Sequence, residues 1–279
     1  DQGVTGIGET QAWRRQGSAE TLVGQINVIK NHFEPQLVGR SPFDIASIMH
    51  GLNESMYHSQ YSQAPVGDAL YDIVGKVLGI PVHQILGGKT RDSVRIAAVL
   101  TMKGTVESLV ESADEFFERG FRHFVLKIGN DPMSDIKNAE ALRNRFGHEV
   151  ALRVDANAAL DYDAALSLLT KLEPFDLETA EQPLAIWDID GMAALAKAVR
   201  MPLMADECAA TDHALIDIIR KRAATSAQTK VAKNGGIYHI RRLWHILAAA
   251  GMGLNPGNHP ATSVATATVA HMCGSWPTE

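Results

Sequence analysis

The stretch Leu152-Arg-Val-Asp155-Ala-Asn157 is a short apolar run that ends in an acidic residue, and its pattern recurs along the chain. Each recurrence closes a run of strand-forming residues with one ionisable side chain. The other members of this series are Lys127, Glu181, Asp206, Lys230 and His259. Neighbouring members are 24–29 residues apart, which suits one strand, one helix and two short loops. The spacing therefore predicts a repeating β–α unit.

Strands that alternate with helices predict an α/β fold with a parallel sheet. The predicted strands are 94–99, 124–127, 150–155, 177–181, 203–206, 226–230 and 253–259. We expect the sheet to close into a (β/α) barrel, because ionisable residues end five or six successive strands and a barrel gathers such residues at one rim. An open, doubly wound sheet is the structural alternative. The sequence predicts no eighth strand.

Residues 1–90 lack this period. Their helix-start and helix-stop signals predict a mostly helical domain. The barrel domain is predicted to follow it, over residues 91–279. The predicted helices are one that Ser18 caps and that runs to Phe33, a second that opens at Ser41-Pro42, and a third from Ala64 to Leu78.

Composition narrows the class of protein. The formal net charge is 26 − 32 = −6, which argues against nucleic-acid binding, since that function selects basic surfaces. No apolar run approaches the roughly 18 residues that a membrane span requires, and the first residues lack the features of a signal peptide. Cys208 and Cys273 form no CxxC pair, so the sequence supports neither a disulfide framework nor a zinc cluster. A cytoplasmic protein is expected.

Asp155, Glu181 and Asp206 offer only carboxylate oxygens, the donors that Mg²⁺ or Mn²⁺ prefers. Any one of them alone could be a helix cap or a surface carboxylate. Three carboxylates at the same phase of the repeat would repel one another without a cation between them. The sequence therefore predicts a divalent-metal site.

Lys127 and Lys230 end the strands before and after the carboxylate series, so each is predicted to flank the metal. A lysine can act as a general base when its surroundings favour the neutral amine. Strand alternation places Val125 on the same side as Lys127, and an apolar neighbour favours that form. The alternative is that each lysine only neutralises the carboxylates.

Two flanking bases and a metal suit the removal of a proton next to a carboxylate, because the metal stabilises the dianion that forms. A class I aldolase that forms a Schiff base on Lys230 or Lys127 is a second enzymatic hypothesis. A barrel that binds a ligand without catalysis is a third.

Eight short motifs are spread over nearly the whole chain. They are Gly6-Ile-Gly-Glu9, Ala69-Leu-Tyr-Asp72-Ile-Val-Gly-Lys76, Leu86-Gly-Gly88, Leu126-Lys-Ile-Gly129, Val154-Asp-Ala-Asn157, Glu181-Gln-Pro183, Ala205-Asp-Glu207 and Lys230-Val-Ala-Lys-Asn-Gly-Gly236. In this order and spacing, the chain resembles the muconate lactonizing enzyme branch of the enolase superfamily, a superfamily that also contains mandelate racemase.

The resemblance implies an α+β capping domain over a modified TIM barrel of the (β/α)7β type. It implies Mg²⁺ on Asp155, Glu181 and Asp206, with Lys127 and Lys230 as the acid/base groups. The implied reaction removes the α-proton of a small carboxylic acid through a metal-stabilised enediolate. Racemisation or epimerisation, cycloisomerisation and dehydration all use that intermediate. The branch is commonly oligomeric, so a homo-oligomer is expected.

Three further residues are assigned roles beside this site. The resemblance implies that Asn157 contacts a metal ligand or a water on the metal. Glu207 is expected to be either a partner of a metal ligand or a solvated neighbour of Asp206. His259 is either a substrate contact or a hydrogen-bonded loop residue. The mandelate racemase His–Asp pair is not transferred, because Lys230 ends the sixth strand. Lys233 is expected on the surface at a helix start, with a position that reaches the rim as the alternative.

The sequence departs from the branch in two ways. Val125 stands where the branch usually has the first lysine of a Lys-x-Lys pair, which puts the basicity of Lys127 in question. The chain also begins after the two strands that usually open the cap, and it ends before the eighth barrel strand. Both domains are therefore expected to be incomplete, the cap at its N-terminal end and the barrel at its C-terminal end.

Overall fold

The computed structural model describes residues 3–12, 20–101 and 104–277. The chain forms two compact units. Unit 1 contains residues 1–94, 228–249 and 254–279, and unit 2 contains residues 95–227 and 250–253. The domain boundary between residues 90 and 91 stays a prediction.

The described residues contain one sheet of seven strands in the sequential order β1 to β7. The pairs from β1 to β6 are parallel. The strands are β1 Ala98–Leu100, β2 His123–Lys127, β3 Ala151–Asp155, β4 Ala180–Glu181, β5 Leu203–Ala205, β6 Ser226–Lys230 and β7 Gly253–Gly257. A doubly wound sheet would reverse its strand order partway, so the sequential order confirms the barrel type of α/β fold.

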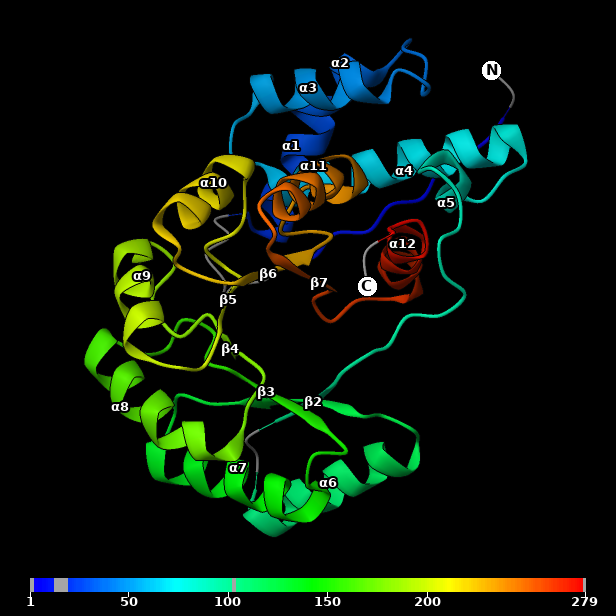
Figure 1. Ribbon diagram of the computed structural model, residues 1–279. Coiled ribbons are helices and arrows are strands. Elements are labelled where there is room, and N and C mark those ends of the chain that lie inside the picture. The colour runs from blue at the N-terminus through cyan, green and yellow to red at the C-terminus, as the bar shows by residue number, and fades with distance from the viewer. Residues whose placement is uncertain (1–2, 13–19, 102–103, 278–279) are drawn as a thin grey trace. The chain divides into compact units, whose positions relative to one another are not determined.

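Each crossover α-helix of unit 2 begins where a short polar side chain caps it. These helices are α6 Val106–Glu118, α7 Pro132–Phe146, α8 Tyr162–Leu172, α9 Ile189–Ala198 and α10 Asp212–Lys221, and the short 3₁₀-helix η2 Glu173–Phe175 follows α8 without such a cap. The caps of α6 to α10 are Thr105, Asp131, Asp161, Asp188 and Thr211, whose side chains all accept a first-turn amide. These bonds satisfy N–H groups that lack a partner within the helix. In Figure 1 these helices lie along one side of strands β2 to β5.

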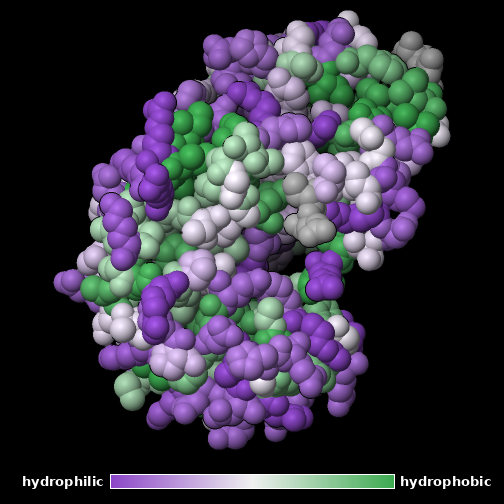
Figure 2. Space-filling model, in the orientation of Figure 1, coloured by the Kyte–Doolittle hydropathy of each residue, from purple (hydrophilic) through white to green (hydrophobic). Residues whose placement is uncertain are grey.

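The helix-facing side of the sheet is apolar, because alternate strand residues point to opposite faces. Phe124, on β2, is fully buried and contacts the ring of Phe146, on α7, in an edge-to-face arrangement with centroids 5.4 Å apart. The outer surfaces of α6 and α7 are mostly hydrophilic in Figure 2. Because side chains alternate along β2, Val125 and Lys127 lie on the opposite face of the sheet from Phe124.

Unit 1 is mainly helical and has its own apolar core. Its helices are α1 Leu22–Val28, the π-helix η1 Ile29–Phe33, α2 Glu34–Leu37, α3 Ile45–Ser55, α4 Gln60–Leu78, α5 Val82–Ile85, α11 Gly236–Ala249 and α12 Ser263–Gly274. Trp244 of α11 is buried in a cluster with Tyr71 of α4 and Met272 of α12. Asp68 joins α4 to α11, because its Oδ1 accepts the amide of Ile237 at 2.9 Å.

Several predicted boundaries were shifted or wrong. The predicted cap Ser18 lies outside the described residues, and Thr21 caps α1 instead. Ser41-Pro42 opens no helix. The Ser41 hydroxyl accepts the amide of Phe43 at 3.3 Å within a local turn, so α3 starts four residues after Ser41. The first strand is shorter than 94–99, because its register with β2 begins only at Ala98.

The later elements follow the prediction closely, and β6 has the predicted bounds. None of the described helices has both the length and the apolarity that crossing a membrane would need.

Candidate active site

The carboxyl ends of neighbouring strands carry the predicted ionisable residues. Lys127 ends β2, Asp155 ends β3 and Glu181 ends β4, while Asp206 follows the last residue of β5. The strand register pairs Lys127 with Asp155, and Asp155 with Glu181. These four residues all belong to unit 2. The parallel pairing therefore brings an ammonium and two carboxylates to adjacent positions at one sheet edge.

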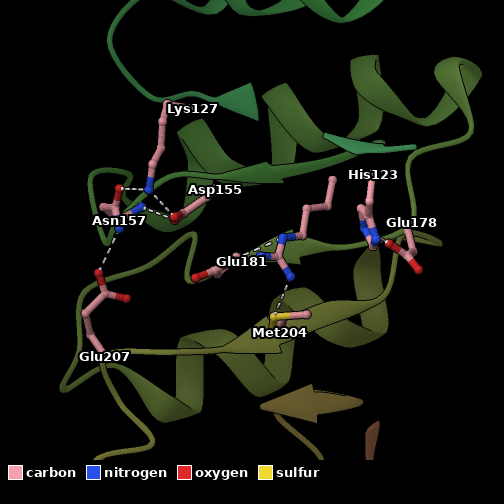
Figure 3. A network of polar contacts seen from close by, with 9 residues as sticks. His123, Lys127, Asp155, Asn157, Glu178, Glu181, Met204 and Glu207 are labelled. Atoms are coloured by element: carbon pink, nitrogen blue, oxygen red, sulfur yellow. Dashed lines mark hydrogen bonds and ion pairs between the residues drawn. The ribbon is translucent and has the colours of Figure 1, made fainter. Parts of the chain in front are cut away.

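Lys127 lies at the centre of a polar network that Figure 3 shows. Its ammonium forms an ion pair with Asp155 and donates a hydrogen bond to Asn157 Oδ1 at 2.7 Å. Asn157 Nδ2 donates to Glu207 Oε1 at 3.1 Å, and the Asn157 amide donates to Asp155 Oδ1 at 2.8 Å. Asn157 thus links the end of β2 to the segment that follows β5.

Arg153 lies beneath this network, two residues before Asp155 on the same face of β3. It is buried, and its Nε lies 3.6 Å from Glu181 Oε2. Its strand-register partner is Val125, the position at which the sequence departs from the Lys-x-Lys pattern. Sequence reasoning missed Arg153, although the two-residue period of a strand places it beside Asp155. A buried guanidinium therefore lies across from the apolar side chain at position 125.

A second pair joins the start of β2 to the segment that precedes β4. Glu178 Oε2 is 2.6 Å from His123 Nε2, as Figure 3 also shows. This contact with His123 is the main cause that holds the pKa of Glu178 below its usual value. Because His123 lies at the opposite end of β2 from Lys127, the pair belongs to the barrel face that usually serves stability.

The loop after Lys127 is fixed by a buried carboxylate. Asp135 of α7 is fully buried, and its Oδ2 accepts the amide of Gly129 at 2.8 Å. Burial raises the pKa of Asp135, while the Gly129 hydrogen bond opposes that shift. The contact ties the turn beyond β2 to the first turn of α7.

The donor set of Asp155, Glu181 and Asp206 suits a hard divalent cation. All three are buried, with 2%, 3% and 0% of their surface exposed, and all offer carboxylate oxygens. Among the residues that the structure describes, no three acidic, histidine or cysteine side chains are grouped so that they could hold a metal ion. Asp155 instead binds Lys127. A cation at this carboxylate would therefore compete with the Lys127 ammonium.

The remaining predicted residues belong to unit 1. Lys230 ends β6, is buried, and donates its main-chain amide to Asn234 Oδ1 at 2.8 Å. His259 is buried and stacks on the ring of Tyr61 with centroids 5.9 Å apart. The catalytic role of Lys230 and the substrate role of His259 stay predictions.

The expectation of a surface position for Lys233 was wrong. Lys233 is 3% exposed, and its Nζ donates to the carbonyl of Gln228 at 2.8 Å. Helix α11 begins only at Gly236, so Lys233 lies in the turn after β6 rather than on an exposed helix face. Sequence spacing could not distinguish these positions.

Two family models match the chain. The model described as "Mandelate racemase / muconate lactonizing enzyme, N-terminal domain" matches residues 1–87. The model described as "Enolase C-terminal domain-like" matches residues 108–279. Together they cover most of the chain, in the order expected from the sequence.

Characterised relatives and a crystal structure agree with these matches. The N-succinyl-L-Arg/Lys racemase of Bacillus cereus is 31% identical over 276 residues, which are 99% of this chain and 74% of that protein. A chloromuconate cycloisomerase of Cupriavidus pinatubonensis is 32% identical over 98% of this chain and 74% of its own length. A mandelate racemase/muconate lactonizing family protein from Azoarcus sp. EbN1 superposes with a TM-score of 0.93 at 33% identity, covering 99% of this chain and 73% of that one. The chain therefore belongs to the muconate lactonizing enzyme branch of the enolase superfamily and is an enzyme with the modified TIM-barrel fold of that superfamily.

Proposed function

We propose that this enzyme removes the α-proton of a small carboxylic acid in a reaction that depends on Mg²⁺, with Mn²⁺ as a substitute. Asp155, Glu181 and Asp206 hold the cation, and Lys127 and Lys230 move the proton. The product arises by racemisation or epimerisation, by cycloisomerisation or by dehydration.

The position of Lys127 carries this proposal. Its amine lies at the end of a strand, is partly accessible, and contacts both Asp155 and Asn157. An amine held within hydrogen-bond reach of a carboxylate at the rim of a barrel is placed to exchange a proton with a bound substrate. The names of two relatives, a racemase and a cycloisomerase, support the same class of chemistry.

The bound cation would offset the negative charge that develops on the substrate carboxylate. Lys127 Nζ takes or returns the proton on one side of the substrate α-carbon, while Asn157 keeps that amine directed by accepting a hydrogen bond from it. Lys230 does the same on the other side. Buried surroundings at Asp155 and Glu181 exclude water, which strengthens the electrostatic interactions within the site.

Exchange of the substrate α-proton with deuterated water tests this function. The protein with Mg²⁺ is incubated in deuterium oxide with a panel of carboxylic acids: N-acylated amino acids, dipeptides, hydroxy acids and muconate. Mass spectrometry follows the uptake of deuterium. We expect uptake by at least one class, its loss in a chelator, and its return when Mg²⁺ is restored.

Single-lysine variants test the two-base assignment in the same assay. Lys127→Ala and Lys230→Ala should each lose exchange from one stereoisomer of the substrate and keep at least part of the other. Full exchange of both stereoisomers in both variants would disprove the assignment. Substrate trapping by borohydride would instead indicate a Schiff base.

A further inference from the structure

Gln182 is a fully buried residue that directly follows Glu181 at the end of β4. Its backbone has a φ angle of +35°, in the left-handed region that side-chain residues rarely adopt. Such conformations persist only where surrounding contacts fix them, and they gather at functional sites. Contacts strong enough to hold this conformation are therefore expected around Gln182.

The side-chain amide of Gln182 forms hydrogen bonds with three main-chain groups. Its Oε1 accepts the amide of Asp206 at 3.0 Å and the amide of Cys208 at 3.2 Å. Its Nε2 donates to the carbonyl of Leu184 at 2.9 Å. One carboxamide thereby joins the segment after β4 to the segment after β5.

The main chain of Gln182 adds two contacts. Its N–H donates to the carbonyl of Met204 on β5 at 2.9 Å, and its carbonyl accepts the amide of Ala158 at 2.8 Å. Ala158 lies three residues after Asp155, in the turn that leaves β3. The ends of β3, β4 and β5 thus meet at one residue, and these strands lead to Asp155, Glu181 and Asp206.

We infer that Gln182 is a positioning residue, which fixes the main chain of Asp206 relative to Glu181. Its carbonyl oxygen reaches the amide of Asp206 itself. Partners that orient metal ligands are costly to remove. The part of this inference that concerns a cation rests on the proposed function. The part that concerns the main chain of Asp206 does not.

Hydrogen exchange of the metal-free protein tests the positioning role directly. The Gln182→Met variant keeps the side-chain length and removes its hydrogen bonds. NMR should show the amides of Asp206 and Cys208 exchanging at least about tenfold faster, because each loses the bond that protects it. Gln182→Glu keeps an acceptor oxygen and should restore most of this protection.

Calorimetric titration of the same variants with Mg²⁺ alone measures whether Gln182 also affects the affinity of the proposed metal site. Gln182→Met should weaken Mg²⁺ binding by about 10–100-fold, the effect typical of partners that orient metal ligands. Gln25→Met is the matched control, because Gln25 is also buried and its Nε2 bonds two carbonyls, of Gln11 and Glu20. It should leave Mg²⁺ affinity and the exchange of both amides unchanged.

Unchanged exchange at Asp206 and Cys208 in Gln182→Met would overturn the inference, as would equal weakening of Mg²⁺ binding by Gln25→Met. If Gln182→Met does not fold, Gln182→Asn is measured in the same way. Its side chain tolerates positive φ but is too short to keep the bonds. A wild-type protein that binds no Mg²⁺ would refute the proposed metal site, while the exchange data would still decide the role of Gln182.

Discussion

Lys127 and the proposed divalent cation would be alternative partners for the Asp155 carboxylate. Lys127 binds Asp155 directly, and Asp155 is also a proposed ligand of the cation. Charges this close, with Asp155 buried, interact by on the order of 1 kcal/mol or more. Cation binding and the Lys127–Asp155 ion pair should therefore oppose each other.

The variant Lys127→Met tests this competition. It removes the ammonium from Asp155 and keeps an apolar side chain of similar length. We expect it to bind Mg²⁺ about tenfold more tightly than the wild type and to lose at least about 100-fold in turnover, the usual contribution of a general acid or base. Calorimetry measures the affinity, and deuterium uptake by the stereoisomer that depends on Lys127 measures the turnover.

Lys171→Met, at an exposed position on α8, serves as the control and should change neither quantity. Weaker Mg²⁺ binding in Lys127→Met would show that Lys127 supports the metal site rather than competing with it.

The sequence predicted where the site residues lie along the strands better than it predicted which side chains they contact. The strand-end positions of Lys127, Asp155 and Glu181 followed from the period of the repeat. The bond from Asn157 to Glu207 did not, because it depends on the left-handed backbone of Asn157, at φ +45°. The role of Gln182 was missed because its contacts join segments from three strands, which sequence spacing does not show.

The helix α12 is anchored to the N-terminal segment by one carboxylate. Glu9 accepts hydrogen bonds from the amide and hydroxyl of Thr262 and from the amide of Ala265. Burial alone would raise the pKa of Glu9, but these bonds outweigh it and lower the pKa. A carboxylate at a helix N-terminus also interacts favourably with the helix dipole. Glu9 belongs to the Gly6-Ile-Gly-Glu9 stretch, so that motif has a structural role here.

Glu9→Gln should destabilise the protein by about 1 kcal/mol, because the glutamine lacks the charge and one of the two acceptor oxygens. Because the pKa of Glu9 is lowered in the folded state, its contribution is present above the unfolded value and disappears as pH falls through the folded value. Urea unfolding at pH 7 and near pH 3 measures the difference. The exposed Glu54→Gln on α3 should have no effect. A loss in Glu9→Gln that is equally large at both pH values would contradict this account.

The elements themselves were largely predictable, and their misplaced starts have local causes. Runs of apolar residues that end in an ionisable group located β2 to β6 to within three residues at either end. Ser41-Pro42 carries a helix-start pattern, yet the Ser41 hydroxyl closes a turn with Phe43. Both uses of a serine side chain satisfy one backbone amide, and sequence alone does not show which of the two the chain adopts.

Asp68 makes the stability of the whole molecule depend on pH. Its carboxylate is buried between α4 and α11, and burial raises its pKa from 3.8 to about 7, although the Ile237 amide opposes the shift. A folded-state pKa above the unfolded value means that the folded protein binds the proton more tightly. The stability from this group is therefore complete below pH 4 and is lost as pH rises through 7.

Asp68→Asn should remove this pH dependence. The asparagine keeps an acceptor oxygen for Ile237 and carries no charge. The variant should match the wild type near pH 4 and exceed its unfolding free energy at pH 8 by on the order of a few kcal/mol. Urea unfolding at both pH values is the measurement. An identical fall in stability between pH 4 and pH 8 in both proteins would show that Asp68 does not titrate in this range.

The superfamily and barrel type were predictable because the motifs recur in order over nearly the whole chain. The substrate was not, because relatives that match the chain about equally well are a racemase, at 31% identity, and a cycloisomerase, at 32% identity. Neither the domain boundary at residue 90 nor the role of Lys230 follows from spacing alone. Both depend on how distant segments meet.

Calorimetric titration of the metal-free protein with Mg²⁺ measures whether side chains from three successive strands bind one cation. We expect saturable binding of one Mg²⁺ per chain. Asp155→Asn, Glu181→Gln and Asp206→Asn should each weaken binding by more than about 100-fold, beyond the effect of partners that only orient ligands. Absence of saturable binding, or unchanged affinity in any one of the three variants, would contradict the proposed metal site.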